Sequence, residues 1–174
     1  MTDSPATLSL IPLDQVEPAM IEAVLDRAFG PGRHSRTAYT LRAGTEWLPG
    51  LSFAGLDADD MLVGTIQVWP VALTDPSGRR HPLLMVGPVA VVPERQGEGF
   101  GLALMAAMTT GLDPRAPLPQ VLIGDPEYYE RFGFHAAPTQ GWSLPGPYEK
   151  HRLLVRAVNP GILPATGTLG PWIG

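Results

Sequence analysis

A glycine-rich turn is the stretch of this sequence best suited to chemistry. Gly97, Gly99 and Gly101 have no Cβ, so the backbone between them can adopt positive φ and direct several N–H groups at one point. A helix expected over 101–110 would add the unsatisfied N–H groups and the positive dipole end of its N-terminus. The turn therefore predicts a binding site for a phosphate or diphosphate group.

The spacing of the glycines separates three kinds of phosphate-binding loop. A Walker loop requires Gly-Lys followed by Ser or Thr, and no lysine follows these glycines. A dinucleotide-binding GxGxxG also fails, because from Gly97 the third glycine falls one position early and from Gly99 the required position holds Leu104. What remains is QxxGxG, formed by Gln96, Gly99 and Gly101 directly after the strand-like run VAVVP.

A second block, GDPEYYERFGF at 124–134, contains the pattern YxxxGF. Together with QxxGxG, this block makes the chain resemble the GNAT superfamily of acyl-CoA N-acyltransferases over most of residues 8–156. The resemblance implies an α/β (α+β mixed) fold. Its central mixed, mostly antiparallel sheet would have about six or seven strands, including a splayed parallel pair, and about four flanking helices.

The resemblance also implies roles for individual residues. The donor substrate would be acetyl-CoA, held through its diphosphate by the loop residues Gln96, Gly97, Glu98, Gly99, Phe100 and Gly101. Arg95 would add charge toward the phosphates, or would simply be exposed to solvent. The N–H of Val89 would polarise the acyl carbonyl and Val91 would bond the pantetheine arm. Tyr129 would stand beside the sulfur and return a proton to the thiolate, or would only pack there.

The sequence identifies no general base. Many relatives carry a glutamate four residues before the N–H that polarises the carbonyl, and this chain has Met85 there. Asp125 is a candidate, but it is equally suited to be the N-cap of a short helix, and Glu94 is expected to be solvated. Deprotonation would then use a water chain, another carboxylate or an amine that is already neutral. An alternative function is a catalytically silent CoA-binding module of the same fold.

The implied activity is direct transfer of an acetyl group, or a longer acyl group, to a primary amine of a small molecule, protein or peptide. The chain has no cysteine, which excludes disulfides and a cysteine nucleophile, and it has no GxSxG motif of a serine hydrolase. Its four histidines form no metal-binding pair, so no metal is expected. A net charge of −5 gives no support for nucleic-acid or membrane partners. We expect a cytoplasmic protein; its acceptor and oligomeric state, with a homodimer among the alternatives, stay open.

Hydrophobic periodicity and turn residues predict the elements that must position these groups. We expect an edge strand at 7–13, a helix that is capped by Asp14 and Glu17 and ends at Gly30, a hairpin of 51–56 and 61–72, a strand at 82–92, the helix 101–110, a strand at 120–123, a short helix at 127–131 and a last strand at 151–158.

Three further segments have ambiguous patterns. Residues 33–44 carry three arginines, which predict either a solvated basic face or a wall on the acceptor side. Residues 139–150 are expected to form a loop. The GNAT domain is expected to span 1–158, followed by a Pro- and Gly-rich tail, 159–174, that is either frayed or docked on an apolar surface.

Overall fold

The computed structural model describes residues 8–173, which pack as two compact units. Of the described residues, unit 1 comprises 8–33, Trp47–Val68 and Gly87–Leu112, and unit 2 comprises His34–Glu46, Trp69–Val86 and 113–173. Strands β3 (Leu62–Thr74) and β4 (Arg80–Val91) each contribute residues to both units.

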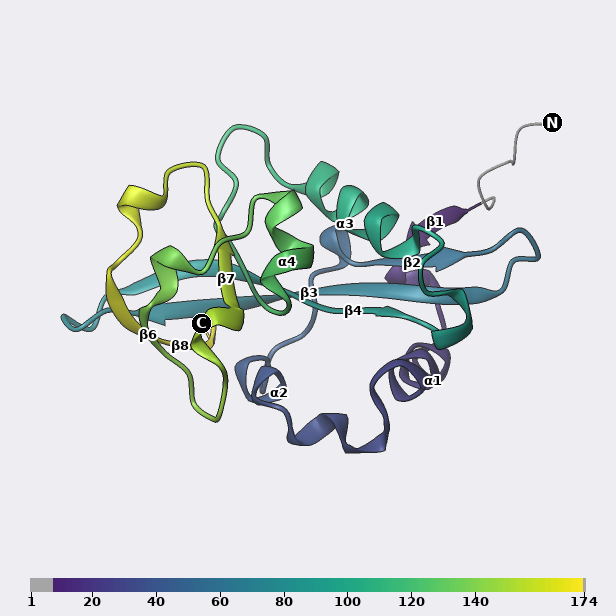
Figure 1. Ribbon diagram of the computed structural model, residues 1–174, viewed down its shortest axis with the longest axis horizontal. Coiled ribbons are helices and arrows are strands. Elements are labelled where there is room, and N and C mark those ends of the chain that lie inside the picture. Colours follow the sequence, from purple (N-terminus) through teal and green to yellow (C-terminus); the bar gives the residue numbers. More distant parts are fainter. Residues whose placement is uncertain (1–7, 174) are drawn as a thin grey trace. The chain divides into compact units, whose positions relative to one another are not determined.

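The described residues form a mixed α/β structure with eight strands and four α-helices (Figure 1). The other strands are β1 (Ser9–Pro12), β2 (Phe53–Leu56), β5 (Gln120–Ile123), β6 (Gly141–Ser143), β7 (Leu153–Arg156) and β8 (Thr166–Pro171). The helices are α1 (Pro18–Phe29), α2 (Thr37–Leu41), α3 (Phe100–Gly111) and α4 (Pro126–Tyr129). None of them is long and apolar enough to cross a membrane.

The sheet is mostly antiparallel, as the sequence predicts. Its hydrogen-bonded order is β1-β2-β3-β4-β5-β7, with β8 paired to β3 and β6 paired to β8. The pairs β1–β2, β2–β3, β3–β8 and β5–β7 are antiparallel, whereas β4–β5 and β6–β8 are parallel. The expected parallel pair is therefore confirmed as β4–β5, and the parallel pairing of β6 with β8 was not expected.

Unit 1 is built around the apolar face of α1. The helix buries Ile21, Val24 and Leu25 at helical spacing, and Gly30 ends it with a φ of 85°. Glu17 is the N-cap residue but makes no side-chain cap, so the predicted capping pair with Asp14 does not form. Figure 1 shows α1 on one side of the unit 1 strands and α3 on the other. The glycine-rich turn is thus attached to a strand and a helix that both enter the unit 1 core.

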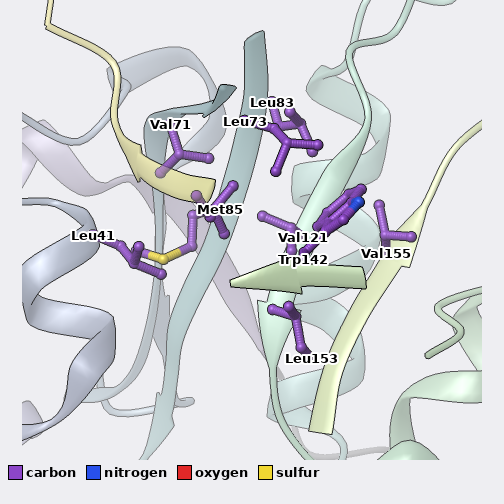
Figure 2. Close-up of a cluster of buried hydrophobic side chains, with 10 residues drawn as sticks. Leu41, Val71, Leu73, Leu83, Met85, Val121, Trp142, Leu153 and Val155 are labelled. Carbon is purple, nitrogen blue, oxygen red and sulfur yellow. The ribbon is translucent and has the colours of Figure 1, made fainter. Parts of the chain in front are cut away.

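Unit 2 has a core of its own around Trp142, which is 1% exposed (Figure 2). In Figure 2 the Met85 side chain of β4 is directed toward Leu41 of α2. The core consists of the buried side chains of Leu41, Val71, Leu73, Leu83, Met85, Val121, Trp142, Leu153, Val155 and Leu169.

The C-terminal segment is docked, which decides between the two alternatives for the tail. Strand β8 pairs with β3 from Val71↔Pro171 to Thr74↔Thr168, and Leu169 is 1% exposed in the unit 2 core. The indole N–H of Trp142 donates to the carbonyl of Pro164 at 2.8 Å. A domain boundary at residue 158 stays a prediction.

Candidate functional site

The glycine-rich turn of unit 1 exposes its backbone. It follows a 3-10 turn, Pro93–Arg95, and residues 96–99 are exposed. Gly97 and Gly99 have φ of 85° and 90°, and no atom lies within 4 Å of the position that a Cβ would take on either residue. Gly99 is the N-cap of α3, whose first N–H groups lack partners within the helix. The turn therefore has the positive φ that the sequence predicts, together with exposed main chain and open space. Binding of an anion there stays a prediction.

The polar side chains of the turn bond to unit 1 itself. The Gln96 Nε2 donates to the carbonyl of Val91 at 3.3 Å. Arg95 is bonded to two carboxylates, Asp57 at 2.6 Å and Glu98 at 2.9 Å. The alternative of a simply solvated Arg95 is therefore wrong. With these side chains engaged, the loop presents its backbone rather than its side chains to a ligand.

The strand that enters the turn alternates between two environments. Ala90 and Val92 are buried in the unit 1 core, whereas Val89 and Val91 are half-buried. Gly87 has a φ of 137°, a region that favours glycine over residues with a Cβ. Contact of the Val89 main chain with an acyl group, and of the Val91 main chain with a pantetheine arm, stays a prediction.

Tyr129 lies in unit 2, where its ring packs against the backbone of Gly124. A Cβ on Gly124 would lie 2.5 Å from Cε2 of Tyr129. The ring also contacts other aromatic side chains: Tyr128 lies edge-on at 4.9 Å between centroids, and Phe134 lies at 6.3 Å. Burial, followed by the neighbouring Tyr128, raises the pKa of Tyr129 to about 12. The phenol is therefore protonated at neutral pH, as a proton donor must be.

Replacing Gly124 with alanine is expected to displace the Tyr129 ring and to lower the free energy of unfolding by about 1–3 kcal/mol, the usual cost of overpacking. The added methyl group would also stand 3.2 Å from Cδ1 of Leu122, so it has little room to move away from the ring. Urea denaturation measures the change. Gly170→Ala in β8 is the matched control, because no atom lies within 4 Å of its Cβ position. Equal stability of the two variants would contradict the packing.

Each of the three positions considered for a proton acceptor is otherwise engaged. Met85 is 3% exposed in the unit 2 core. Asp125 is the N-cap of α4 and accepts a hydrogen bond from the N–H of Glu127 at 3.0 Å, which confirms the cap interpretation. Glu94 is paired with Arg27, whose hydrogen bond lowers the pKa of this carboxylate. Within residues 8–173, no three acidic or histidine side chains lie together as a metal ion would require.

Two arginines of the segment 33–44 are buried, so a solvated basic face is the wrong interpretation for them. Arg33 is 3% exposed and pairs, in unit 1, with Glu22 and Asp26. In unit 2, Arg42 is 8% exposed, and its guanidinium carbon lies 3.6 Å from the centroid of the Tyr39 ring and 4.7 Å from that of Trp69. Arg42 is the C-cap residue of α2 and follows Tyr39 by three residues, a spacing that could have indicated this stacking. A role on the acceptor side stays a prediction.

Comparison with known proteins finds a matching family profile and solved structures of the same fold. The family profile described as an acetyltransferase (GNAT) domain matches residues 19–137. The uncharacterized N-acetyltransferase YhbS of Escherichia coli K12 is 26% identical over 144 residues, which cover 80% of this chain and 83% of YhbS. The crystal structure of Escherichia coli YhbS in complex with CoA superposes with a TM-score of 0.71 at 24% identity, over 98% of this chain and 93% of the other. A GNAT family acetyltransferase from Brucella melitensis, in complex with acetyl-CoA, gives a TM-score of 0.66 at 28% identity, over 95% and 96% of the two chains.

Proposed function

Because the chain belongs to the acetyltransferase (GNAT) family, we propose that it transfers an acetyl group from acetyl-CoA directly to a primary amine. The observation that carries the proposal is the open backbone of the glycine loop, where Gly97 and Gly99 have positive φ and no atom stands near their Cβ positions. Relatives with this fold have been crystallised with CoA and with acetyl-CoA, which supports the same ligand here.

In this proposal the loop binds the diphosphate of CoA through main-chain N–H groups. Residues 97–101 supply these donors, since the N–H of Gln96 already donates to the carbonyl of Pro93, and the positive end of the α3 dipole adds to them. The N–H of Val89 polarises the acyl carbonyl, and the main chain of Val91 orients the pantetheine arm. Bound acetyl-CoA supplies the acetyl group as a reactive thioester.

Proton return to the departing thiolate is assigned to Tyr129. Its pKa of about 12 keeps the hydroxyl protonated, and within residues 8–173 this hydroxyl makes no hydrogen bond that would compete. Met85 cannot accept the proton of the amine, so the acceptor amine arrives neutral or loses its proton to water. The acceptor, a small-molecule or a protein or peptide amine, and a cytoplasmic location are parts of the proposal.

Calorimetry and a thiol-release assay test the proposal together. We expect acetyl-CoA to bind with one site per chain, and CoA thiol to be released in the presence of some members of a library of primary amines. Failure of acetyl-CoA to bind would contradict the proposal. ATP and NAD serve as controls, because the glycine spacing predicts that neither shifts the thermal stability.

The second candidate function is a CoA-binding module without catalysis. The buried, apolar Met85 favours it, since this position offers no proton acceptor. Tight CoA binding with no thiol release from any amine of the library would support the module and contradict the enzyme. Thiol release with any primary amine would exclude it.

A further inference from the structure

Asp57 closes the turn between β2 and β3 in unit 1. Its Oδ1 accepts hydrogen bonds from the N–H groups of Asp59 at 2.9 Å and Met61 at 3.0 Å. Its Oδ2 accepts a third hydrogen bond, from Nη1 of Arg95 at 2.6 Å, and 11% of the side chain is exposed. A single carboxylate therefore connects a hairpin turn to the residue that leads into the glycine loop.

Arg95 is held from three directions within unit 1. Besides its bond to Asp57, its Nε donates to Oε2 of Glu98 at 2.9 Å, and its guanidinium carbon lies 5.2 Å from the centroid of the Phe100 ring. Phe100 is 1% exposed and is the first residue of α3. The hydrogen bonds that Arg95 donates to Glu98 and then to Asp57 raise the pKa of Arg95. Arg95 is thus held against the hairpin turn at Asp57 and against the far end of the loop at Glu98 and Phe100.

The charges of this cluster argue against Arg95 as a phosphate ligand. Asp57 and Glu98 together carry more negative charge than Arg95 neutralises, so the cluster is net negative. A phosphate placed against it would meet repulsion, whereas the exposed loop backbone offers N–H donors. The cluster therefore contributes to anion binding through the loop conformation that it holds, and not through electrostatic attraction.

We propose that Asp57 and Glu98 are positioning residues, which act through Arg95 to hold residues 96–99 in the conformation that binds the CoA diphosphate before CoA arrives. This inference rests on the proposed function. A loop that is ordered before binding loses less conformational entropy when CoA binds. Ordering of the loop therefore tightens the binding of CoA. The cluster has no role at the reacting atoms in this proposal, so we expect turnover at saturating acetyl-CoA to be unchanged.

Asp57→Asn tests the connection while keeping the turn. The asparagine Oδ1 can still accept from Asp59 and Met61, but its amide N–H₂ opposes the donors of Arg95. We expect the dissociation constant for CoA to rise about tenfold, with kcat at saturating acetyl-CoA within about twofold of wild type. Hydrogen exchange of the amides at 96–99, measured without CoA, is expected to become faster.

Glu94→Gln is the matched control. It removes one negative charge from the same segment and breaks the ion pair with Arg27. The side chains of this pair are exposed, Glu94 to 54% and Arg27 to 52%. Exposed ion pairs contribute little, so we expect CoA affinity equal to or slightly tighter than that of wild type, and unchanged exchange at 96–99. The difference between the two variants separates loop ordering from net charge.

The sign of the effect makes the test decisive. Removing a negative charge beside an anion site should tighten anion binding by Coulomb attraction alone, so weaker binding by Asp57→Asn supports positioning. Equal or tighter binding together with unchanged amide exchange would overturn the proposal. It would also be overturned by an Arg95→Gln variant that weakens binding far more than Asp57→Asn, since Arg95 would then be a direct ligand. A wild-type protein that binds no CoA counts against the proposed function alone, and amide exchange still decides whether Asp57 orders the loop.

Discussion

Replacing Gly99 with tryptophan is expected to abolish measurable CoA binding while the protein remains folded. Gly99 has a φ of 90°, and no atom lies within 4 Å of its Cβ position, so the indole would project into the space that the proposed diphosphate occupies. The left-handed backbone adds about 1–2 kcal/mol of strain for a residue with a Cβ. We expect the affinity for CoA, measured by calorimetry, to fall by at least about 100-fold.

Gly78→Trp is the matched control for this variant. Gly78 has a φ of 88°, no atom lies within 4 Å of its Cβ position, and it lies in the exposed turn between β3 and β4. Gly78→Trp therefore introduces the same side chain and the same backbone strain as Gly99→Trp, without altering the glycine loop. CoA binding by Gly99→Trp as tight as that of Gly78→Trp would refute the role of the loop.

Strong local signals account for what could be predicted from the sequence. The strand 120–123 is found with the expected bounds, because it is a short apolar run between proline-rich and glycine turns. The helix after the glycine loop begins at Phe100, one residue before the expected start, since Gly99 rather than Phe100 adopts the left-handed cap conformation. The short helix expected at 127–131 is found after β5 as α4, which ends at Tyr129 and is followed by a 3-10 helix, Glu130–Phe132. In each case, neighbouring residues determine the structure.

Contacts between distant residues account for what could not be predicted. Strand β8 contains two glycines and a proline, so its sequence has no strand pattern, and it forms because β3 and β6 supply hydrogen-bonding partners. Asp57 and Arg95 are separated by 38 residues, and nothing near either residue indicates the other. The burial of Arg33 similarly depends on two carboxylates of α1. The backbone of the candidate site was thus predictable from local sequence, whereas the side chains that support it were not.

Tyr129→Phe is expected to lower kcat by at least about 100-fold and to leave CoA affinity unchanged. The phenylalanine ring keeps the packing against Gly124 and loses only the hydroxyl, and general acid catalysis contributes about 10²–10⁴-fold. Thiol release gives kcat, and calorimetry gives the dissociation constant. Tyr128→Phe is the control, because its ring lies beside Tyr129 while its hydroxyl has no assigned role. Unchanged kcat in Tyr129→Phe would remove the acid role and leave the acetyltransferase proposal standing.

The pH dependence of the wild type provides a second test of the same residue. With a pKa of about 12, the Tyr129 phenol stays protonated through the neutral and moderately alkaline range, so its ionisation should cause no loss of kcat below about pH 11. The folded-state pKa lies above the value of about 10 in an unfolded chain. The neutral phenol therefore contributes stability that is fully present below about pH 10 and is lost as the pH rises to about 12, because only the unfolded chain has then released its proton. Tyr129→Phe should lack this part of the alkaline loss of stability, and an identical alkaline profile in urea denaturation would show that the phenol is not buried as described.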